Sequence, residues 1–371
     1  MALRHLVPAW LVALFTVVLL TPFVRLLAIR VGALDFPDAR KVHRRPTPRL
    51  GGLAVLGGVT AGVGLYVWLS GIRLSPVLLA TSAGAYGVAL IGMIDDIRGL
   101  RPWVKLALEC LAALLPVSFG LQIEFLSLPF DGLVALNLKY IMIAITVLWI
   151  VGVTNAVNLS DGLDGLAAGL SLVSALVITV YSHAQAILSV AVVSSVVAAA
   201  CLGFLVFNVH PARIFLGDSG SLMLGYILGA LSVMGVAKGA TLMTLFIPVF
   251  IMGVPVIDTL AAIIRRLARR RPVLQPDREH LHHRLMDCGL AYEHSVYLIY
   301  ALSAVSGAIA LVLGRVPLAY YVLGLLVSGL ALAVIGGIRS HTTQSAATIS
   351  VSSEVAAGSA EQNEKRKGAL K

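Results

Sequence analysis

The sequence predicts an all-α integral membrane protein with about eleven transmembrane helices, and composition is the first observation that predicts it. Of the 371 residues, 58% are hydrophobic and only 12% are charged, about half of the ~25% usual in a soluble domain. Mean hydropathy is +0.94, and the apolar residues form runs of helical length rather than alternating ten-residue segments. These observations exclude an ordinary soluble enzyme and an outer-membrane barrel.

Eleven apolar runs are long enough to cross a hydrocarbon core of ~30 Å, which takes ~20 residues of helix. The first run follows Arg4 and His5, but it is too long for a signal peptide and has no small-residue cleavage site before Arg25, so we expect it to be retained. The predicted spans are residues 6–28, 52–70, 75–94, 102–119, 139–157, 165–182, 185–207, 220–237, 240–263, 295–313 and 317–338.

The distribution of basic residues predicts the orientation of these helices. With the N-terminus outside, the cytoplasmic segments hold 23 of the 28 Lys and Arg residues, as the positive-inside rule requires. The C-terminus is then cytoplasmic. Cytoplasmic loops that face anionic lipid account for the net charge of +10, so no nucleic-acid partner is expected. The outside segments hold only Arg4, Arg73, Lys139, Lys238 and Arg315.

Two segments fall outside the helical pattern. Residues 120–138 alternate weakly around Pro129–Gly132 and predict a small hairpin. Residues 341–371 are rich in Ser, Ala, Thr and Gln and predict a disordered cytoplasmic tail. The expected organisation is a polytopic transmembrane domain, residues 1–340, followed by this tail. The three cysteines are widely scattered and predict neither a disulfide framework nor a zinc site.

Five aspartates gather at the predicted cytoplasmic ends of spans: Asp95, Asp96, Asp161, Asp164 and Asp218. Acidic side chains at the ends of membrane helices are costly unless they are hydrated, paired or bound to a cation. Because these five come from three loops that reach the same membrane face, they predict one shared site for a polyanion and a metal ion.

The adjacent pair Asp95 and Asp96 ends the third predicted span. Neighbouring like charges resist joint ionisation, so such a pair supplies either metal ligands or a base with a raised pKa. The alternative is a hydrated helix end that balances the charges of Arg98 and Arg101.

The segment 155–165, Asn-Ala-Val-Asn-Leu-Ser-Asp-Gly-Leu-Asp-Gly, carries amide and carboxylate oxygens close together. In a helical conformation Asn158 and Asp161 share a face, as do Asp161 and Asp164. Such oxygens suit Mg²⁺, which keeps several waters and uses few protein ligands together with substrate phosphate. The alternative is that these residues only cap the following span.

Asp218 lies at the start of the eighth predicted span, between glycines. An aspartate at this place is most often an N-cap, but it can also hold a cation beside a phosphate that the helix N–H groups bind. Asp258 and Glu109 lie deeper within spans, where we expect structural hydrogen bonds.

Basic residues gather in the first cytoplasmic loop, which contains Arg40, Lys41, His43 and Arg49. Arginine binds phosphate oxygens in a bidentate fork, and the prolines of the loop stiffen it in a way that topology alone does not require. The alternative is that these charges serve only to orient the chain.

The last large loop contains an arginine run suited to lipid headgroups, and then His280, His282, His283 and Arg284. The spacing does not fit a zinc protease. Clustered imidazoles can bind or protonate a phosphate, and the alternative is a hydrated loop without chemistry.

Together these motifs resemble the polyprenyl-phosphate N-acetylhexosamine-1-phosphate transferases. The resemblance runs in order from about residue 20 to about residue 300, and it depends on the combination of five motifs rather than on any one of them. The matching stretches are Arg40-Lys41-x-His43 with Pro46–Gly52, Asp95-Asp96, Asn155–Gly165, Phe215–Ser221 and His280–Arg284.

The resemblance implies a Mg²⁺-dependent enzyme, with Mn²⁺ as the other metal, that transfers a sugar 1-phosphate from a UDP-sugar to undecaprenyl phosphate and releases UMP. It implies Asn158 and Asp218 as metal ligands. The chemistry is consistent with this, because an attack of one polyanion on another depends chiefly on charge neutralisation and positioning. The resemblance further implies catalytic roles for Asp95, Asp96, Asp161, Asp164, His282 and His283, and substrate binding by Arg40, Lys41, His43, Arg49, Lys105, Asn155, His280 and Arg284.

The His-x-His-His-Arg pattern resembles the N-acetylglucosamine branch of the family, which starts teichoic acid, O-antigen or related cell-envelope glycans. The peptidoglycan branch carries a triple-His stretch instead. One position departs from the pattern, since Gly99 stands where the N-acetylglucosamine branch often has lysine. Arg98, Arg101 or Lys105 would then supply the missing charge.

The expected location is the bacterial plasma membrane, with UDP-N-acetylhexosamine and undecaprenyl phosphate as partners and a homodimer as the family habit. Two alternatives remain at this point. One is transfer of phospho-MurNAc-pentapeptide in peptidoglycan synthesis. The other is a cation-coupled transporter that uses Asp258 and Glu109, although the absence of a visible internal repeat counts against it.

Overall fold

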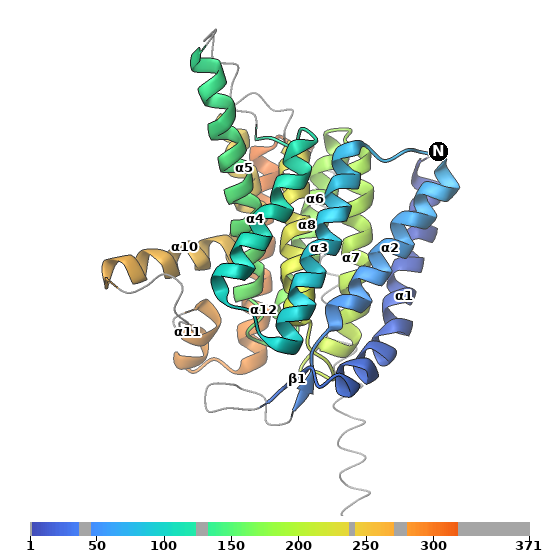
Figure 1. Cartoon of the computed structure of the whole chain (residues 1–371), viewed down its shortest axis with the longest axis vertical. Helices are drawn as coiled ribbons and strands as arrows, with labels where there is room; N and C mark the ends of the chain where they lie inside the picture. Colours follow the sequence, from blue (N-terminus) through green and yellow to red (C-terminus); the bar gives the residue numbers. More distant parts are fainter. Residues whose placement is uncertain (1, 37–45, 124–132, 237–241, 271–279, 318–371) are drawn as a thin grey trace, which may run out of the picture. The chain divides into compact units, whose positions relative to one another are not determined.

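The computed structural model describes residues 2–36, 46–123, 133–236, 242–270 and 280–317. The described part of the chain is almost entirely helical (Figure 1). Its helices are α1 (Ala2–Arg30), α2 (Gly51–Ser70), α3 (Pro76–Arg98), α4 (Pro102–Ser118), α5 (Leu133–Leu159), α6 (Leu166–Ala184), α7 (Leu188–Asn208), α8 (Gly217–Val236), α9 (Leu242–Ile251), α10 (Gly253–Ala268), α11 (Leu281–Asp287) and α12 (Tyr292–Leu313).

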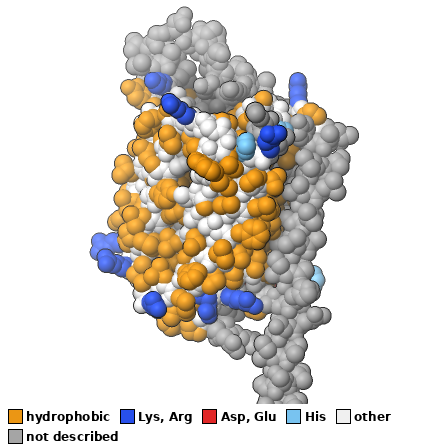
Figure 2. Space-filling model, turned by 90° about the vertical axis from the view of Figure 1, so that its right-hand side faces the viewer, with side chains coloured by type: hydrophobic (Ala, Val, Ile, Leu, Met, Phe, Trp, Pro, Cys, Tyr) orange, Lys and Arg blue, Asp and Glu red, His pale blue; other side chains and the backbone are white. Residues whose placement is uncertain are grey.

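Seven of these helices are long and apolar enough to cross a membrane: α1, α2, α3, α5, α6, α7 and α12. Figure 2 shows a face on which apolar side chains form a broad band, with Lys and Arg side chains towards its two ends. The helical, multi-pass membrane architecture predicted from the sequence is thereby confirmed. The predicted number of spans and their orientation remain predictions, and residues 317–338 lie almost wholly outside the described residues.

The expectation of a single helix over residues 240–263 is wrong. The segment forms two helices, α9 and α10, which meet at Met252, and α10 leaves the bundle at a steep angle (Figure 1). Pro255 has no N–H to donate to the carbonyl four residues earlier, and this missing bond explains why the helix breaks here. Of the predicted hairpin at 120–138, residues 124–132 lie outside the description and residues 133–138 begin α5.

Small residues let α2 and α3 pack closely against α8. A Cβ on Gly52 would lie 2.2 Å from the backbone of Gly220, and one on Gly92 would lie 2.3 Å from the carbonyl oxygen of Asp218. Since real side chains do not approach that closely, only glycine fits at both positions. These contacts bring the motif segment around Asp218 against the ends of two helices that are distant in the sequence.

A short backbone ladder joins the first loop to the segment before α8. Strands β1 (Leu34–Asp35) and β2 (Thr47–Pro48) pair in antiparallel fashion. The N–H of Phe215 donates to the carbonyl of Pro48 at 2.8 Å, and the N–H of Gly51 donates back to Phe215 at 3.0 Å. This ladder fixes the base of the first loop beside the start of α8. The predicted tail at 341–371 lies outside the described residues.

A carboxylate-rich cavity at one end of the bundle

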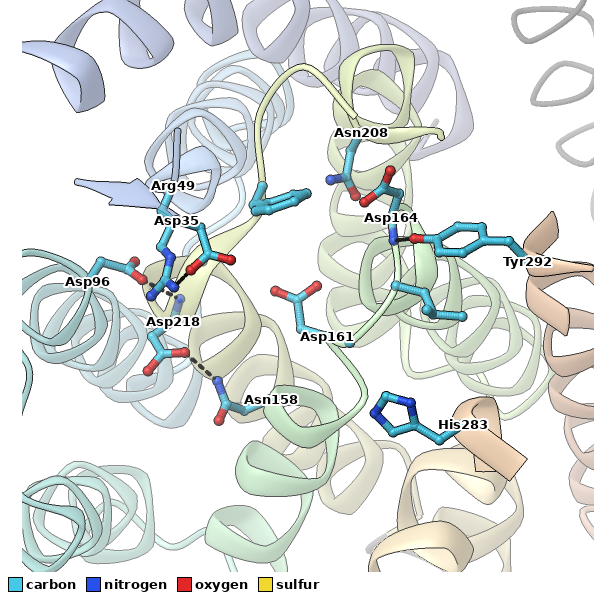
Figure 3. A pocket seen from close by; sticks show the side chains of 14 residues that line it. Asp35, Arg49, Asp96, Asn158, Asp161, Asp164, Asn208, Asp218, His283 and Tyr292 are labelled. Carbon is cyan, nitrogen blue, oxygen red and sulfur yellow. Dashed lines mark hydrogen bonds and ion pairs between the residues drawn. The ribbon is translucent and has the colours of Figure 1, made fainter. Parts of the chain in front are cut away.

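A cavity of ≈ 340 Å³ lies where the ends of α3, α5 and α7 meet the starts of α8 and α12. Figure 3 shows the side chains converging on it from these separate elements. Among the described residues its lining includes five carboxylates and one Lys or Arg side chain, that of Arg49, and buried carboxylates are stable only when they are paired or bind cations. The polar side chains that line it are Asp35, Arg49, Asp96, Asn158, Asp161, Asp164, Asn208, Asp218, His283 and Tyr292.

Lys105 joins two of the predicted aspartates. Its ammonium group lies 2.5 Å from Oδ2 of Asp218 and 2.9 Å from Oδ2 of Asp95. The sequence left three candidates for the basic partner of this motif, and the structure places Lys105 there. Arg98 and Arg101 are exposed on the neighbouring turn. Lys105 thus holds two carboxylates together beside the cavity.

Asp96 binds the N-terminus of α8. Its two carboxylate oxygens accept hydrogen bonds from the N–H groups of Asp218 and Ser219, each at 3.0 Å. The first N–H groups of a helix have no partner within the helix, and an anion there is favoured by the helix dipole. Asp96 therefore fixes the position of α8, and with it the position of Asp218.

Two asparagines of α5 lie one turn apart and bind different partners. The Asn158 amide donates to Oδ1 of Asp218 at 2.8 Å and to the hydroxyl of Ser221 at 2.9 Å. The Asn155 amide donates to Oε2 of the buried Glu109 at 2.5 Å. Glu109 thus has the structural bond expected of it, and the predicted substrate residue Asn155 lies outside the cavity lining.

Asp161 occupies the middle of the cavity, with its carboxylate directed into the open space (Figure 3). Among the described residues, no hydrogen bond or ion pair involves this carboxylate. Burial, together with the charges of Asp218, Asp96 and Asp164, raises the pKa of the Asp161 carboxyl to about 8. A carboxylate that has no partner among the described residues and lies near three others is suited to meet a cation.

Asp164 shapes the rim rather than the centre. Its Oδ2 atom is 2.7 Å from Nδ1 of His210 and accepts the N–H of Ala212 at 3.0 Å. The hydroxyl of Tyr292 binds the Asp164 N–H (Figure 3). Asn208 binds the N–H of Gly165 at 3.1 Å, which ties the end of α7 to the same loop. These bonds hold the loop that carries Asp161.

The histidine loop is tied to α10 through Asp258. Oδ2 of Asp258 lies 2.9 Å from Nδ1 of His280, and Oδ1 accepts the N–H of Leu281 at 3.0 Å. Asp258 therefore orients the start of α11, which agrees with the structural role expected for it. Both of the carboxylates on which a transporter would depend, Asp258 and Glu109, are thus engaged in bonds between helices.

Only one of the three predicted histidines faces the cavity. His283 lines it (Figure 3), whereas His282 is buried with its ring against Gly162. Burial, followed by the nearby His283 and His280, lowers the pKa of His282 to about 4, so this ring is neutral at physiological pH. Arg284 is exposed and does not line the cavity.

Of the predicted basic residues of the first loop, Arg49 lines the cavity and forms an ion pair with Asp35 (Figure 3). Arg40, Lys41 and His43 lie outside the described residues. Asp35 was not predicted from the sequence as a site residue.

Three further residues were missed: Asn208, His210 and Tyr292. Their signal was weak, because polar residues at the two ends of apolar spans are ordinary. The sequence feature from which Asn208 and His210 could have been predicted is the stretch Asn208-Val-His210-Pro, only a few residues before the motif around Asp218. Nothing in the sequence distinguishes Tyr292 from other tyrosines.

The donor atoms present suit a hard cation such as Mg²⁺. The cavity offers oxygen atoms from Asp161, Asp218 and Asn158, and hard divalent cations prefer oxygen. In the described ranges, no three His, Cys, Asp or Glu side chains form a group that could hold a metal ion by themselves. Mg²⁺ does not require such a group, because it keeps its waters and uses one or two carboxylates plus substrate phosphates.

Known proteins are similar to this chain over most of its length. Residues 78–236 match the model of glycosyl transferase family 4. The chain is 44% identical over 309 residues to a probable undecaprenyl-phosphate N-acetylglucosaminyl 1-phosphate transferase of Bacillus subtilis, covering 83% of this chain and 85% of that protein.

Two other relatives show the range of similarity. A decaprenyl-phosphate N-acetylglucosaminephosphotransferase of Mycolicibacterium smegmatis is 41% identical over 322 residues, which is 80% of this chain and 79% of that protein. A phospho-N-acetylmuramoyl-pentapeptide-transferase of Moorella thermoacetica is 34% identical over 291 residues, which is 72% of this chain and 86% of that protein.

Proposed function

Because the chain belongs to glycosyl transferase family 4, we propose that it transfers N-acetylglucosamine 1-phosphate from UDP-N-acetylglucosamine to undecaprenyl phosphate and releases UMP. It is a multi-pass protein of the bacterial plasma membrane. The product would be the first membrane-bound intermediate of a cell-envelope glycan, such as a teichoic acid or an O-antigen. The identities of 44% and 41% to N-acetylglucosamine phosphate transferases, against 34% to a pentapeptide transferase, support the choice of sugar.

The observation that carries this proposal is the carboxylate-rich cavity at the end of the membrane bundle. A polyprenyl phosphate is held in the bilayer and a UDP-sugar comes from water, so their phosphates meet only near the membrane boundary. The cavity lies at the ends of the spans α3, α5 and α7, which is such a boundary. The five carboxylates of its described lining suit a site that binds cations together with phosphates.

The reaction exchanges one phosphorus–oxygen bond for another. An oxygen of the acceptor phosphate forms a bond to the sugar-linked phosphorus, and the bond from that phosphorus to the UMP oxygen breaks. Bound Mg²⁺, or Mn²⁺ in its place, would neutralise charge on the pyrophosphate. Little else is required of the protein than positioning and charge stabilisation, as in other phosphoryl transfers.

Asp218, Asn158 and Asp161 are the residues that we propose to hold the cation. The first two are bonded to each other at 2.8 Å, and Asp161 faces the same space from the next turn of chain. Lys105 lies against Asp218, where its ammonium group can contact a phosphate oxygen. Arg49, which also lines the cavity, is placed to bind a phosphate by its guanidinium fork.

The other predicted catalytic residues have positioning roles in this proposal. Asp96 holds the start of α8, and Asp95 binds Lys105 and the N–H of Leu100. Asp164 holds the rim of the cavity through His210. His282 packs beneath the Asp161 loop, and His283, which lines the cavity, is the histidine that we propose to contact substrate.

The test is release of UMP by the purified full chain with undecaprenyl phosphate and Mg²⁺. UDP-N-acetylglucosamine, UDP-N-acetylgalactosamine and UDP-MurNAc-pentapeptide would be compared as donors. Turnover with the first donor that is lost in Asp161→Asn and retained in Asp287→Asn, an exposed aspartate outside the cavity, is the expected result. Turnover only with the pentapeptide donor would keep the chemistry and reject the sugar, and no turnover with any donor would reject the proposal.

A further inference from the structure

A second cavity, of ≈ 280 Å³, lies between α2 and α3, with α7 and α8 behind it. It is lined by residues 56–67 of α2 and by residues 78–86 of α3, and it reaches Leu74 in the connection between these two helices. Figure 1 shows α2 diverging from α3 towards this connection. Leu78 is separated from Asp96 by 18 residues of helix α3, about 27 Å at the usual helical rise. The end of the second cavity at Leu74 and Leu78 is therefore far from the carboxylate-rich cavity, whereas its other end, at Leu56, lies only seven residues after Arg49.

The described walls of this cavity are mainly apolar. Its four polar side chains are Thr60, Thr81, Ser82 and Tyr86, and every hydroxyl has a partner within the protein. Thr60 donates to the carbonyl of Leu56 at 2.7 Å and lies 2.5 Å from the Tyr86 hydroxyl. Thr81 and Ser82 donate to carbonyls one turn earlier, at 2.8 Å and 2.9 Å. Since each of these hydroxyl hydrogens is already donated, a polar ligand would find no free hydroxyl donor on these side chains.

The surroundings of the cavity determine what fills it. Both α2 and α3 qualify as membrane spans, and the side chains of Leu79 and Tyr86 at its edge are about half exposed, 54% and 46%. An apolar cavity of about 150 Å³ inside a protein already binds a molecule as large as benzene. A larger cavity that opens between two membrane spans is accessible to lipid chains. If the cavity stayed empty, its lining would lose the dispersion contacts that such a chain provides.

A basic residue is next in sequence to one end of the cavity. Arg73 is exposed and directly precedes Leu74, which lines the cavity. It is the single Lys or Arg of the five-residue connection 71–75. Arginine at a membrane interface binds the phosphate of an anionic lipid. An apolar slot that ends at an arginine matches the two parts of a phospholipid.

We propose that the α2–α3 cavity binds one acyl chain of an anionic phospholipid, whose phosphate lies at Arg73. This lipid would belong to the leaflet opposite the carboxylate-rich cavity. It would fill the space between α3, which carries Asp96 of that cavity at its other end, and α2, which begins two residues after Arg49 of that cavity. The proposal does not depend on the reaction that the enzyme performs.

Gly64 provides the sharpest test because it lines the cavity and has open space in front of it. A Cβ added at Gly64 would meet nothing within 4 Å, so a side chain can begin there without a clash, and Gly64→Leu adds bulk to the lining of the slot. Gly87 on α3 also has nothing within 4 Å but does not line the cavity, so Gly87→Leu is the matched control. Neither residue contacts the carboxylate-rich cavity.

The experiment titrates the delipidated full chain in mild detergent with phosphatidylglycerol and counts bound lipid by native mass spectrometry. We expect one tightly bound phosphatidylglycerol in the wild type and in Gly87→Leu. In Gly64→Leu the affinity should fall roughly tenfold or more, since excluding even two methylene groups has that effect. Equal binding by Gly64→Leu and wild type would overturn the proposal.

A second pair of variants tests the headgroup without altering the bundle. Arg73→Gln should bind phosphatidylglycerol no better than phosphatidylcholine, whereas Arg315→Gln, also exposed in a connection, should keep the wild-type preference. If both variants, or neither, lost the preference for phosphatidylglycerol over phosphatidylcholine, the result would contradict the placement of the lipid phosphate at Arg73. Displacement of phosphatidylglycerol by an equal amount of undecaprenyl phosphate would show that the cavity takes a prenyl chain, which also contradicts the proposal.

Discussion

The two cavities are similar in size, ≈ 340 and ≈ 280 Å³, and share three helices, yet their chemistry is opposite. The first is lined by the ends of α3 and α7 and by the start of α8. The second is lined by the first part of α3, by Val193 of α7 and by Ile227 and Leu231 of α8. Asp96 and Leu78, for example, belong to opposite ends of α3.

The difference follows from the backbone. The start of a helix presents N–H groups without partners, and these attract carboxylates and phosphates; Asp96 already binds two such groups on α8. In the middle of a helix every backbone group is bonded, and even the hydroxyls of Thr60 and Thr81 bond to it. One bundle can therefore offer a polar site at its end and an apolar site within it.

The largest effect is expected at the polar cavity, from Asp218→Asn. This change keeps the shape of the side chain but removes the charge that faces Lys105 and the proposed cation. UMP release should fall by about 10²- to 10³-fold, the usual cost of removing a group that stabilises developing charge. The measurement is the initial rate with saturating Mg²⁺, and Asp287→Asn serves as control. A variant with more than about half the wild-type rate would show that the carboxylate is dispensable.

Substitutions at two glycines of α2 allow a tightly packed position to be compared with one that has open space in front of it. Gly52→Ala places a Cβ 2.2 Å from Gly220, and overpacking of this kind costs about 1–3 kcal/mol of unfolding free energy. Gly64→Ala meets nothing within 4 Å and should stabilise the helix by roughly 0.5–1 kcal/mol. Thermal unfolding of both variants in the same detergent measures the difference. Changes of the same sign in the unfolding free energy of both variants would contradict the close contact between α2 and α8.

The raised pKa of Asp161 predicts a pH dependence at the polar cavity alone. With its pKa at about 8, this carboxyl is protonated in the free protein at neutral pH, and a cation favours its ionised form. Cation binding then releases a proton, so affinity should rise by up to about tenfold per pH unit until pH passes 8 and then level off. Isothermal titration of Mg²⁺ with UMP between pH 6 and pH 9 measures this slope. Asp161→Asn should abolish it, whereas the phosphatidylglycerol affinity of the wild type should show no such slope.

Much of the fold follows from the sequence because a bilayer limits the possible structures to apolar helices of fixed length. Ten of the eleven predicted spans overlap a described helix, and α2 differs from its predicted range by a single residue. The break at Met252 was missed because hydropathy averages over the segment, whereas the cause is the single missing N–H of Pro255. Helices of equal hydropathy can therefore be continuous or broken.

The site was less predictable in its details than in its location. Charge placement alone was enough to predict that three distant loops reach one end of the bundle. It did not distinguish Asp96, which is engaged with α8, from Asp161, whose carboxylate faces open space, because that depends on tertiary contacts. Sequence spacing likewise did not separate His282, buried against Gly162, from His283, which lines the cavity.

The smallest predicted effect concerns a helix cap at the apolar end of the bundle. Ser75 precedes α3, and its hydroxyl accepts the N–H of Leu78 at 3.3 Å, so Ser75→Ala should lower the unfolding free energy by about 0.5–1 kcal/mol. Ser70→Ala is the control, since that hydroxyl donates to the carbonyl of Tyr66 at the end of α2 and caps no helix start. UMP release should be unchanged in both variants, because neither serine lines the polar cavity. A marked loss of activity in Ser75→Ala alone would show that the start of α3 is coupled to Asp96 at its other end, and the two cavities would then have to be treated as one functional unit.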